Sequence, residues 1–90
     1  MSTRVAILGI VVENPESVGK LNDILHEYSR YIIGRMGVPY KERGISLISI
    51  MVDGPSDSIS ALSGKIGQLD GVTAKAVYRS EEHTSELQSR

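Results

Sequence analysis

The chain contains no cysteine among its 90 residues. Disulfide bonds, thiolate zinc sites and iron–sulfur ligation by this chain are therefore excluded, because each needs a cysteine sulfur. Tryptophan and phenylalanine are also absent, and aromatic residues make up only 4%. Apolar residues still reach 40%, so we expect one domain with a core of Ile, Val, Leu, Ala and Met. A core this small is marginal alone, and self-association is a common remedy.

An excess of charge of either sign is missing too, since the formal net charge is −1 and the pI is about 6.1. Nucleic-acid and anionic membrane surfaces attract clustered Lys and Arg, so we expect neither partner. The longest apolar run is too short to span a membrane, and we expect a cytoplasmic protein. Apart from His83 near the C-terminus, His26 is the only histidine. Lacking a second His or Cys beside it, His26 is predicted to be a solvated surface residue, and we expect no metal and no cofactor.

A short turn-like motif occurs twice. Residues 12–15 (Val-Glu-Asn-Pro) and residues 52–55 (Val-Asp-Gly-Pro) each follow an apolar run, with the two prolines 40 positions apart. After each motif, apolar residues recur at helical spacing: Val18, Leu21, Leu25 and Tyr28, then Ile59, Leu62, Ile66 and Leu69. The pattern predicts a strand, a turn and a helix, written twice.

Signals at the predicted helix ends support these two helices. Asn14 is predicted to cap the first helix, with a proline at its first position, where a missing N–H costs nothing. Ser56 and Asp57 are the candidate caps of the second helix. Gly71 is predicted to end that helix in the left-handed conformation.

Four segments have the composition of strands. Residues 5–12 form a near-continuous run rich in β-branched residues, which predicts a central strand buried on both faces or nearly so, with Gly9 marking a close helix approach. Residues 31–40 contain two glycines and Pro39, which predicts an edge strand. Residues 45–52 and 72–78 complete the set, and a polar hairpin at 41–44 joins the second strand to the third.

The sum is β-α-β-β-α-β, an α+β ferredoxin-like fold. Right-handed crossovers place both helices on one face of a four-stranded antiparallel sheet. The expected strand order is 4-1-3-2, which puts the Pro39 strand at an edge. We expect this domain to cover residues 1–78.

Residues 79–90 do not fit the fold, because they lack apolar periodicity. Residues 79–89 are similar to the in-frame translation of a common sequencing adapter. We therefore interpret residues 79–90 as a non-native or disordered tail and exclude His83 from the functional argument.

The candidate ligand site lies at the first strand–helix turn, at Glu13, Asn14, Glu16 and Ser17. Backbone N–H groups at a helix start can bind anionic or polar groups. The alternative is that these residues only cap the helix and complement its dipole.

The candidate oligomer interface is the predicted edge strand at 31–40, with Ile33, Arg35, Met36 and Val38 as its contact residues. The glycines beside Arg35 and Met36 would let a partner backbone or a ligand approach closely. The alternative is an edge strand with a bulge.

The chain resembles a family of iron-only hydrogenase system regulators, which are stand-alone ACT-like domains. Residues 4–13, 31–40, 44–54 and 62–72 carry the resemblance. It implies a non-enzymatic regulatory module that assembles as a dimer or tetramer through sheet edges or faces. ACT domains more widely bind amino acids at the first strand–helix turn.

The chain is also similar to the C-terminal domain of the nickel-responsive repressor. It lacks the ribbon-helix-helix arm of that protein, so we expect no direct contact with nucleic acid.

Three hypotheses stay open. The chain is a regulatory domain that senses a small molecule or binds a protein partner, a purely structural oligomerisation module without ligand, or a small enzyme. The last would require a cleft with a perturbed ionisable pair, for which the sequence offers little support.

Overall fold

The computed structural model describes residues 3–80. The tail predicted for residues 79–90 therefore lies, from residue 81 on, outside the described residues. The elements along the chain are β1 (Thr3–Val12), η1 (Pro15–Ser17), α1 (Val18–Glu27), η2 (Ser29–Tyr31), β2 (Ile32–Tyr40), η3 (Lys41–Arg43), β3 (Ile45–Pro55), α2 (Ser56–Gly67) and β4 (Val72–Tyr78), where η denotes a 3₁₀ helix.

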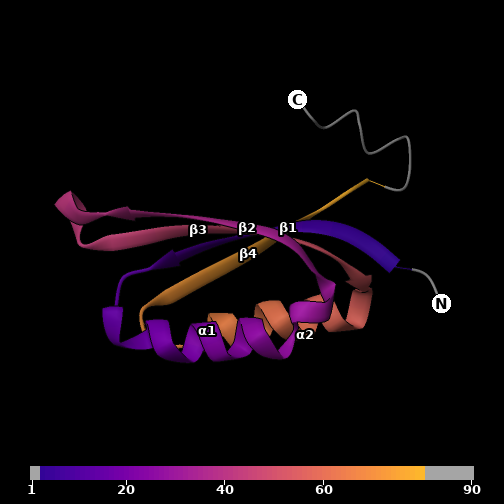
Figure 1. Ribbon diagram of the computed structural model, residues 1–90, viewed down its shortest axis with the longest axis horizontal. Helices are drawn as coiled ribbons and strands as arrows, with labels where there is room; N and C mark the ends of the chain where they lie inside the picture. The colour runs from indigo at the N-terminus through magenta and orange to yellow at the C-terminus, as the bar shows by residue number, and fades with distance from the viewer. Residues whose placement is uncertain (1–2, 81–90) are drawn as a thin grey trace.

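The four strands form one antiparallel sheet in the order β2-β3-β1-β4. This is the predicted order 4-1-3-2 taken from the opposite edge, so the predicted ferredoxin-like topology is confirmed. Both helices cover the same face of the sheet, and no helix of residues 3–80 lies on the other face (Figure 1). β2, which contains Pro39, is an edge strand as predicted.

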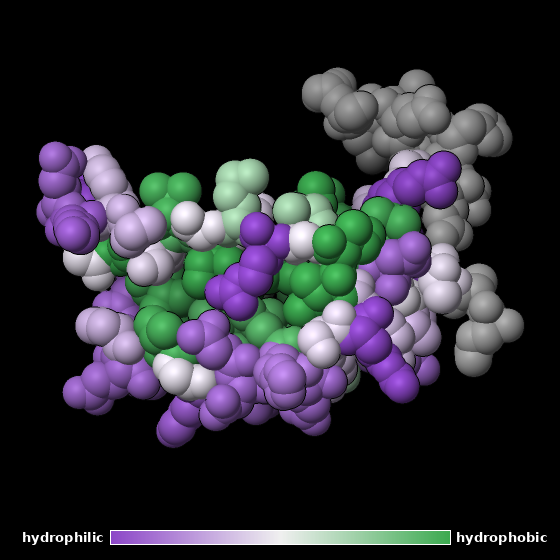
Figure 2. Space-filling view, viewed as in Figure 1, coloured by the Kyte–Doolittle hydropathy of each residue, from purple (hydrophilic) through white to green (hydrophobic). Residues whose placement is uncertain are grey.

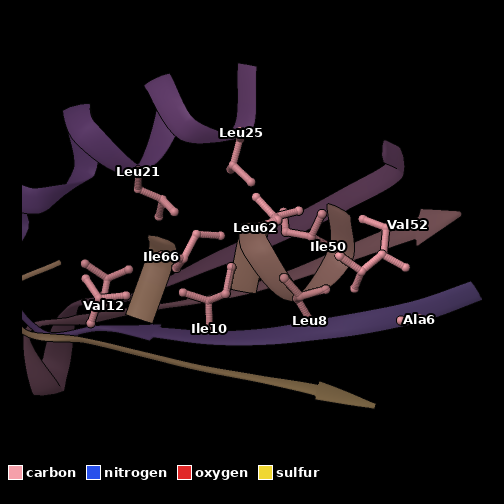
Figure 3. Close-up of a cluster of buried hydrophobic side chains, with 12 residues drawn as sticks. Ala6, Leu8, Ile10, Val12, Leu21, Leu25, Ile50, Val52, Leu62 and Ile66 are labelled. Carbon is pink, nitrogen blue, oxygen red and sulfur yellow. The ribbon is translucent and has the colours of Figure 1, made fainter. Parts of the chain in front are cut away.

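The core lies between the sheet and the two helices (Figure 3). It is aliphatic, as the composition predicts, and its buried members come from β1, β3, β4 and both helices: Ala6, Leu8, Ile10, Val12, Leu21, Leu25, Ile50, Val52, Ile59, Leu62, Ile66 and Val72. At about 25 cal/mol for each Å² of apolar surface removed from water, this burial is the main term that stabilises the fold.

Only one face of β1 is buried. Its even-numbered side chains from Ala6 to Val12 are buried, whereas Ile7 keeps 46% of its surface exposed. The prediction of a strand buried on both faces is therefore wrong, because both helices lie on one side. Gly9 lies on the uncovered side, and a Cβ added to it would meet nothing within 4 Å. The predicted close approach of a helix to Gly9 is wrong as well.

The second copy of the turn motif is part of a strand. β3 continues to Pro55, and Asp53 pairs with Val5 in the ladder with β1. Pro55 is the N-cap of α2, and no side chain caps that helix. The predicted capping by Ser56 and Asp57 is therefore wrong, because the strand leads directly into the helix.

Two further boundaries differ from the prediction. α2 ends at Gly67 rather than next to Gly71, although Gly71 has the predicted left-handed conformation, with φ at +70°. β2 begins at Ile32, after the 3₁₀ turn that contains Tyr31, and the pairing of β2 with β3 shifts register between Ile32 and Gly34. The bulge that the sequence offered as an alternative for this strand is therefore present.

Candidate functional site

Asn14 organises the first turn. Its Oδ1 accepts a hydrogen bond from the backbone N–H of Glu16 at 3.0 Å, which is the predicted N-cap. Its Nδ2 donates to Oδ2 of Asp70 at 2.8 Å. One side chain thus caps the 3₁₀ turn η1 that leads into α1 and holds the turn before β4.

Two more hydrogen bonds join the same segments. The Ser17 hydroxyl, with only 5% of the residue exposed, donates to the carbonyl of Asp70 at 2.6 Å. The N–H of Glu13 donates to the carbonyl of Gly71 at 2.7 Å. The polar atoms of Asn14 and Ser17 are therefore engaged within the chain, which favours a structural role for them.

A hollow of about 400 Å³ adjoins this turn. Of the four predicted ligand residues, Asn14, Glu16 and Ser17 line it, and Glu13 does not. The remaining lining residues are Lys20, Gln68, Leu69 and Asp70. The sequence argument missed these residues because most of them lie far from the turn along the chain. The pairing of β1 with β4, which includes Val12 opposite Val72, brings the two segments together.

The predicted interface residues do not share one surface. Arg35 lies on the helix side of β2, where its Nη2 is 3.5 Å from Oδ1 of Asn22 on α1. Met36 and Val38 are exposed on the opposite side, and Ile33 is exposed at the bulge. The structure thus brings Met36 and Val38 together and separates Arg35 from them.

Met36 and Val38 belong to a broad uncovered surface, which we call the outer face. Strand register assigns to it Val5, Ile7, Gly9 and Val11 of β1, Gly34, Met36, Val38 and Tyr40 of β2, Leu47, Ser49, Met51 and Asp53 of β3, and Thr73, Lys75 and Val77 of β4. Figure 2 shows apolar side chains standing along the sheet side of the molecule, while the helix side is polar. A solvent-facing side of an antiparallel sheet is ordinarily polar, so this composition is unusual.

A shallow apolar hollow of about 320 Å³ lies in the outer face. Gly9 and Ser49, which pair across β1 and β3, are its small residues. Larger side chains border it, among them Val11, Met36 and Leu47. Sequence reasoning missed this surface, because an apolar run in a strand does not tell burial within one chain from burial against another.

Residues 3–80 offer neither a cluster of metal ligands nor a membrane-spanning helix. No group of His, Cys, Asp and Glu side chains there is arranged to hold a metal ion, and His26 is exposed on α1. No helix in that range has the length and apolarity needed to cross a membrane.

A protein-family model and several solved structures are similar to this chain. A family model described as "TM1266-like: Iron-only hydrogenase system regulator, putative" matches residues 4–76. The structure of the uncharacterized protein TM1266 from Thermotoga maritima is 36% identical, has a TM-score of 0.84, and covers 88% of this chain and 100% of its own.

A formyltetrahydrofolate deformylase from Pseudomonas putida matches 81% of this chain with 28% of its own, at 14% identity and a TM-score of 0.60. That likeness shows a shared fold alone. No curated protein matches the chain.

Proposed function

Because this chain belongs to the TM1266-like family, we propose that it is a regulator of an iron-only hydrogenase system that acts by protein contact rather than by catalysis. The single observation that carries the mode of action is the outer face. Val38 and Val77, at 53% and 68% exposure, stand in water there beside Ile7 and Leu47. A contiguous apolar surface of this kind marks an interaction site.

The proposed regulator works as a homo-oligomer, a dimer or a tetramer, in the cytoplasm. Burial of the outer face would add a second apolar layer to a domain whose own core is a single layer. That addition supports self-association, since small domains gain stability in this way.

Sensing of a small molecule at the first turn is the second candidate. The hollow beside this turn is lined by side chains of both charges, with Lys20 positive and Glu16 and Asp70 negative. A zwitterion of amino-acid size would match this lining. Thermal-shift screening of amino acids tests it, and a lack of any shift at millimolar concentration would rule out the sensing role.

The regulatory role is tested in the host organism. Deletion of the gene is expected to change the hydrogenase activity of the cells, and the wild-type gene is expected to restore it. Ile7→Glu, which puts a charge in the middle of the outer face, is expected to behave like the deletion. Val18→Glu is the matched control, because Val18 is similarly exposed but lies on α1. Unchanged hydrogenase activity after deletion would refute the proposal.

A further inference from the structure

We propose that the hollow in the outer face binds a small amphipathic carboxylate, that is, a singly charged acid with a hydrocarbon tail. Lys75 and Ser49 hold the carboxylate above Gly9. The tail lies against Met36 and Leu47. This inference rests on the proposed function in one respect, because a ligand bound there covers the surface through which the regulator makes its contact and thereby controls that contact.

The strand register places a gap in the outer face between two polar side chains. Gly9 lies between Lys75 of β4 and Ser49 of β3, and Met36 of β2 follows Ser49 in the same row. A Cβ added to Gly9 would meet nothing within 4 Å. Because neighbouring strands are about 4.8 Å apart, a small group above Gly9 lies within reach of both Lys75 and Ser49. The row is thus a dimple with an ammonium at one end and a thioether at the other.

The two polar groups beside Gly9 are available to a ligand. Within residues 3–80, neither the Lys75 ammonium nor the Ser49 hydroxyl forms a hydrogen bond or an ion pair. Asp53, the acidic residue of the outer face in that range, lies four residues from the level of Gly9 along β1, or about 13 Å at about 3.3 Å per residue. Lys75 is therefore a positive charge without a counter-ion at the margin of an apolar hollow.

The rest of the hollow suits a hydrocarbon tail. Val11, Val38 and Leu47 form the row next to Gly9 and line the hollow together with Met36. Met36 and Val38 are 61% and 53% exposed, and covering such apolar surface is favourable. The volume of about 320 Å³ is near the lower end of the range for small-molecule sites, so the ligand is small.

A carboxylate fits this site better than a phosphate or a neutral molecule. The single ammonium of Lys75 matches a single negative charge, and the Ser49 hydroxyl can donate to the second carboxylate oxygen. A phosphate carries nearly two charges at neutral pH and is typically bound by arginine forks, yet no arginine of residues 3–80 lines this hollow. A neutral apolar molecule would leave the charge of Lys75 without a counter-ion.

Titration of the isotope-labelled full chain with octanoate, followed by NMR, tests the site. Saturable shifts are expected at the amides of Gly9, Ser49 and Lys75, with a dissociation constant on the order of 1 mM because the hollow is shallow. Several protein concentrations should be used, since a competing self-contact lowers the apparent affinity as the protein concentration rises.

Gly9→Val fills the dimple, and it is expected to weaken octanoate binding at least tenfold. Valine suits a strand and meets nothing at its Cβ, so the variant is expected to fold. Gly37→Val is the matched control, because Gly37 pairs with Ile48 on the helix side of the sheet. It is expected to bind octanoate as wild type does, and thermal unfolding checks that both variants fold.

Charge reversal tests the role of Lys75. Wild type is expected to bind octanoate about two- to fivefold more tightly than octylammonium, which is what an exposed ion pair contributes. Lys75→Glu is expected to reverse this preference. Lys20→Glu makes the same change of charge on α1, beside the hollow at the first turn, and is expected to keep the preference for octanoate.

The failure of this inference is distinguishable from that of the proposed function. The inference would be overturned by a lack of saturable shifts, by shifts confined to the first turn, by wild-type affinity in Gly9→Val, or by an unchanged preference in Lys75→Glu. Each of these results leaves the proposed function standing. Hydrogenase activity that is unchanged by deletion of the gene would overturn the proposed function, and octanoate binding at the outer face would stand without it.

Discussion

Two glycines with the same backbone conformation are expected to respond very differently to replacement by alanine. Gly44 and Gly71 have φ values of +68° and +70°. A Cβ at Gly44 would meet nothing within 4 Å, whereas a Cβ at Gly71 would lie 2.7 Å from Cβ of Asn14 and 3.0 Å from its backbone nitrogen. The pair therefore separates the cost of the left-handed conformation from the cost of the contact.

The expected magnitudes follow from these surroundings. An L-residue in the left-handed region costs about 1–2 kcal/mol, which both variants bear. The smaller entropy of the unfolded alanine chain offsets this equally in the two cases. At Gly71, the backbone contact must also be relieved, at about 1–3 kcal/mol for overpacking. That relief would strain the hydrogen bond from the N–H of Glu13 and the pairing of Asn14 with Asp70.

Urea unfolding followed by far-ultraviolet circular dichroism is the suitable assay, since the chain has no tryptophan. Gly71→Ala is expected to lose about 1–3 kcal/mol more than Gly44→Ala, or about 4–8 °C of melting temperature for each kcal/mol. Both variants should be compared at one protein concentration. Equal losses of unfolding free energy at Gly44 and Gly71 would show that the first turn moves away from Gly71 without cost. That result would refute the inference that the first turn and the turn before β4 are rigidly joined.

The remaining predictions concern two polar clusters. Asn14→Ala is expected to cost about 1–2 kcal/mol, measured by the same assay. Asn14→Asp keeps the cap but sets a second carboxylate beside Asp70, so its stability should fall at neutral pH and recover in acid; wild-type stability at neutral pH would contradict this. Hydrogen bonds to Tyr28 and then Glu27 raise the pKa of Lys65. A lysine whose pKa is raised in the folded state contributes stability at pH values below its unfolded-state pKa, and this contribution is lost as the pH rises through the folded-state pKa. The greater stability of wild type over Lys65→Met should therefore hold at neutral pH and vanish above pH 10.5. A stability difference that stays constant across that pH range would contradict this prediction.

The strand order was predictable because local and global rules agree on it. Pro39 restricts its strand to an edge, and the handedness of the crossovers places the other three. The aliphatic core and the capping by Asn14 also follow from local sequence. These features depend on residues that are close in the chain or on rules that hold for every fold.

The outer face and the residues that contact the first turn could not be predicted from the sequence, because both depend on how distant elements pack together. Ile7 and Leu8 are equally apolar, and only the position of the helices decides which of them is buried. Asn14 and Asp70 are 56 residues apart, and nothing local relates them. The second turn motif was misassigned because Pro55 is equally compatible with the last position of a strand.

The position of β1 also governs when the chain can fold during synthesis. β1 is made first, yet it lies between β3 and β4, and β4 ends at Tyr78. Until residues 72–78 leave the ribosome, one edge of the most apolar strand has no partner, and non-local pairings of this kind are slow to form and prone to aggregation. The sheet of residues 3–80 is thus completed only when β4, the last of its strands along the chain, becomes available to pair with β1.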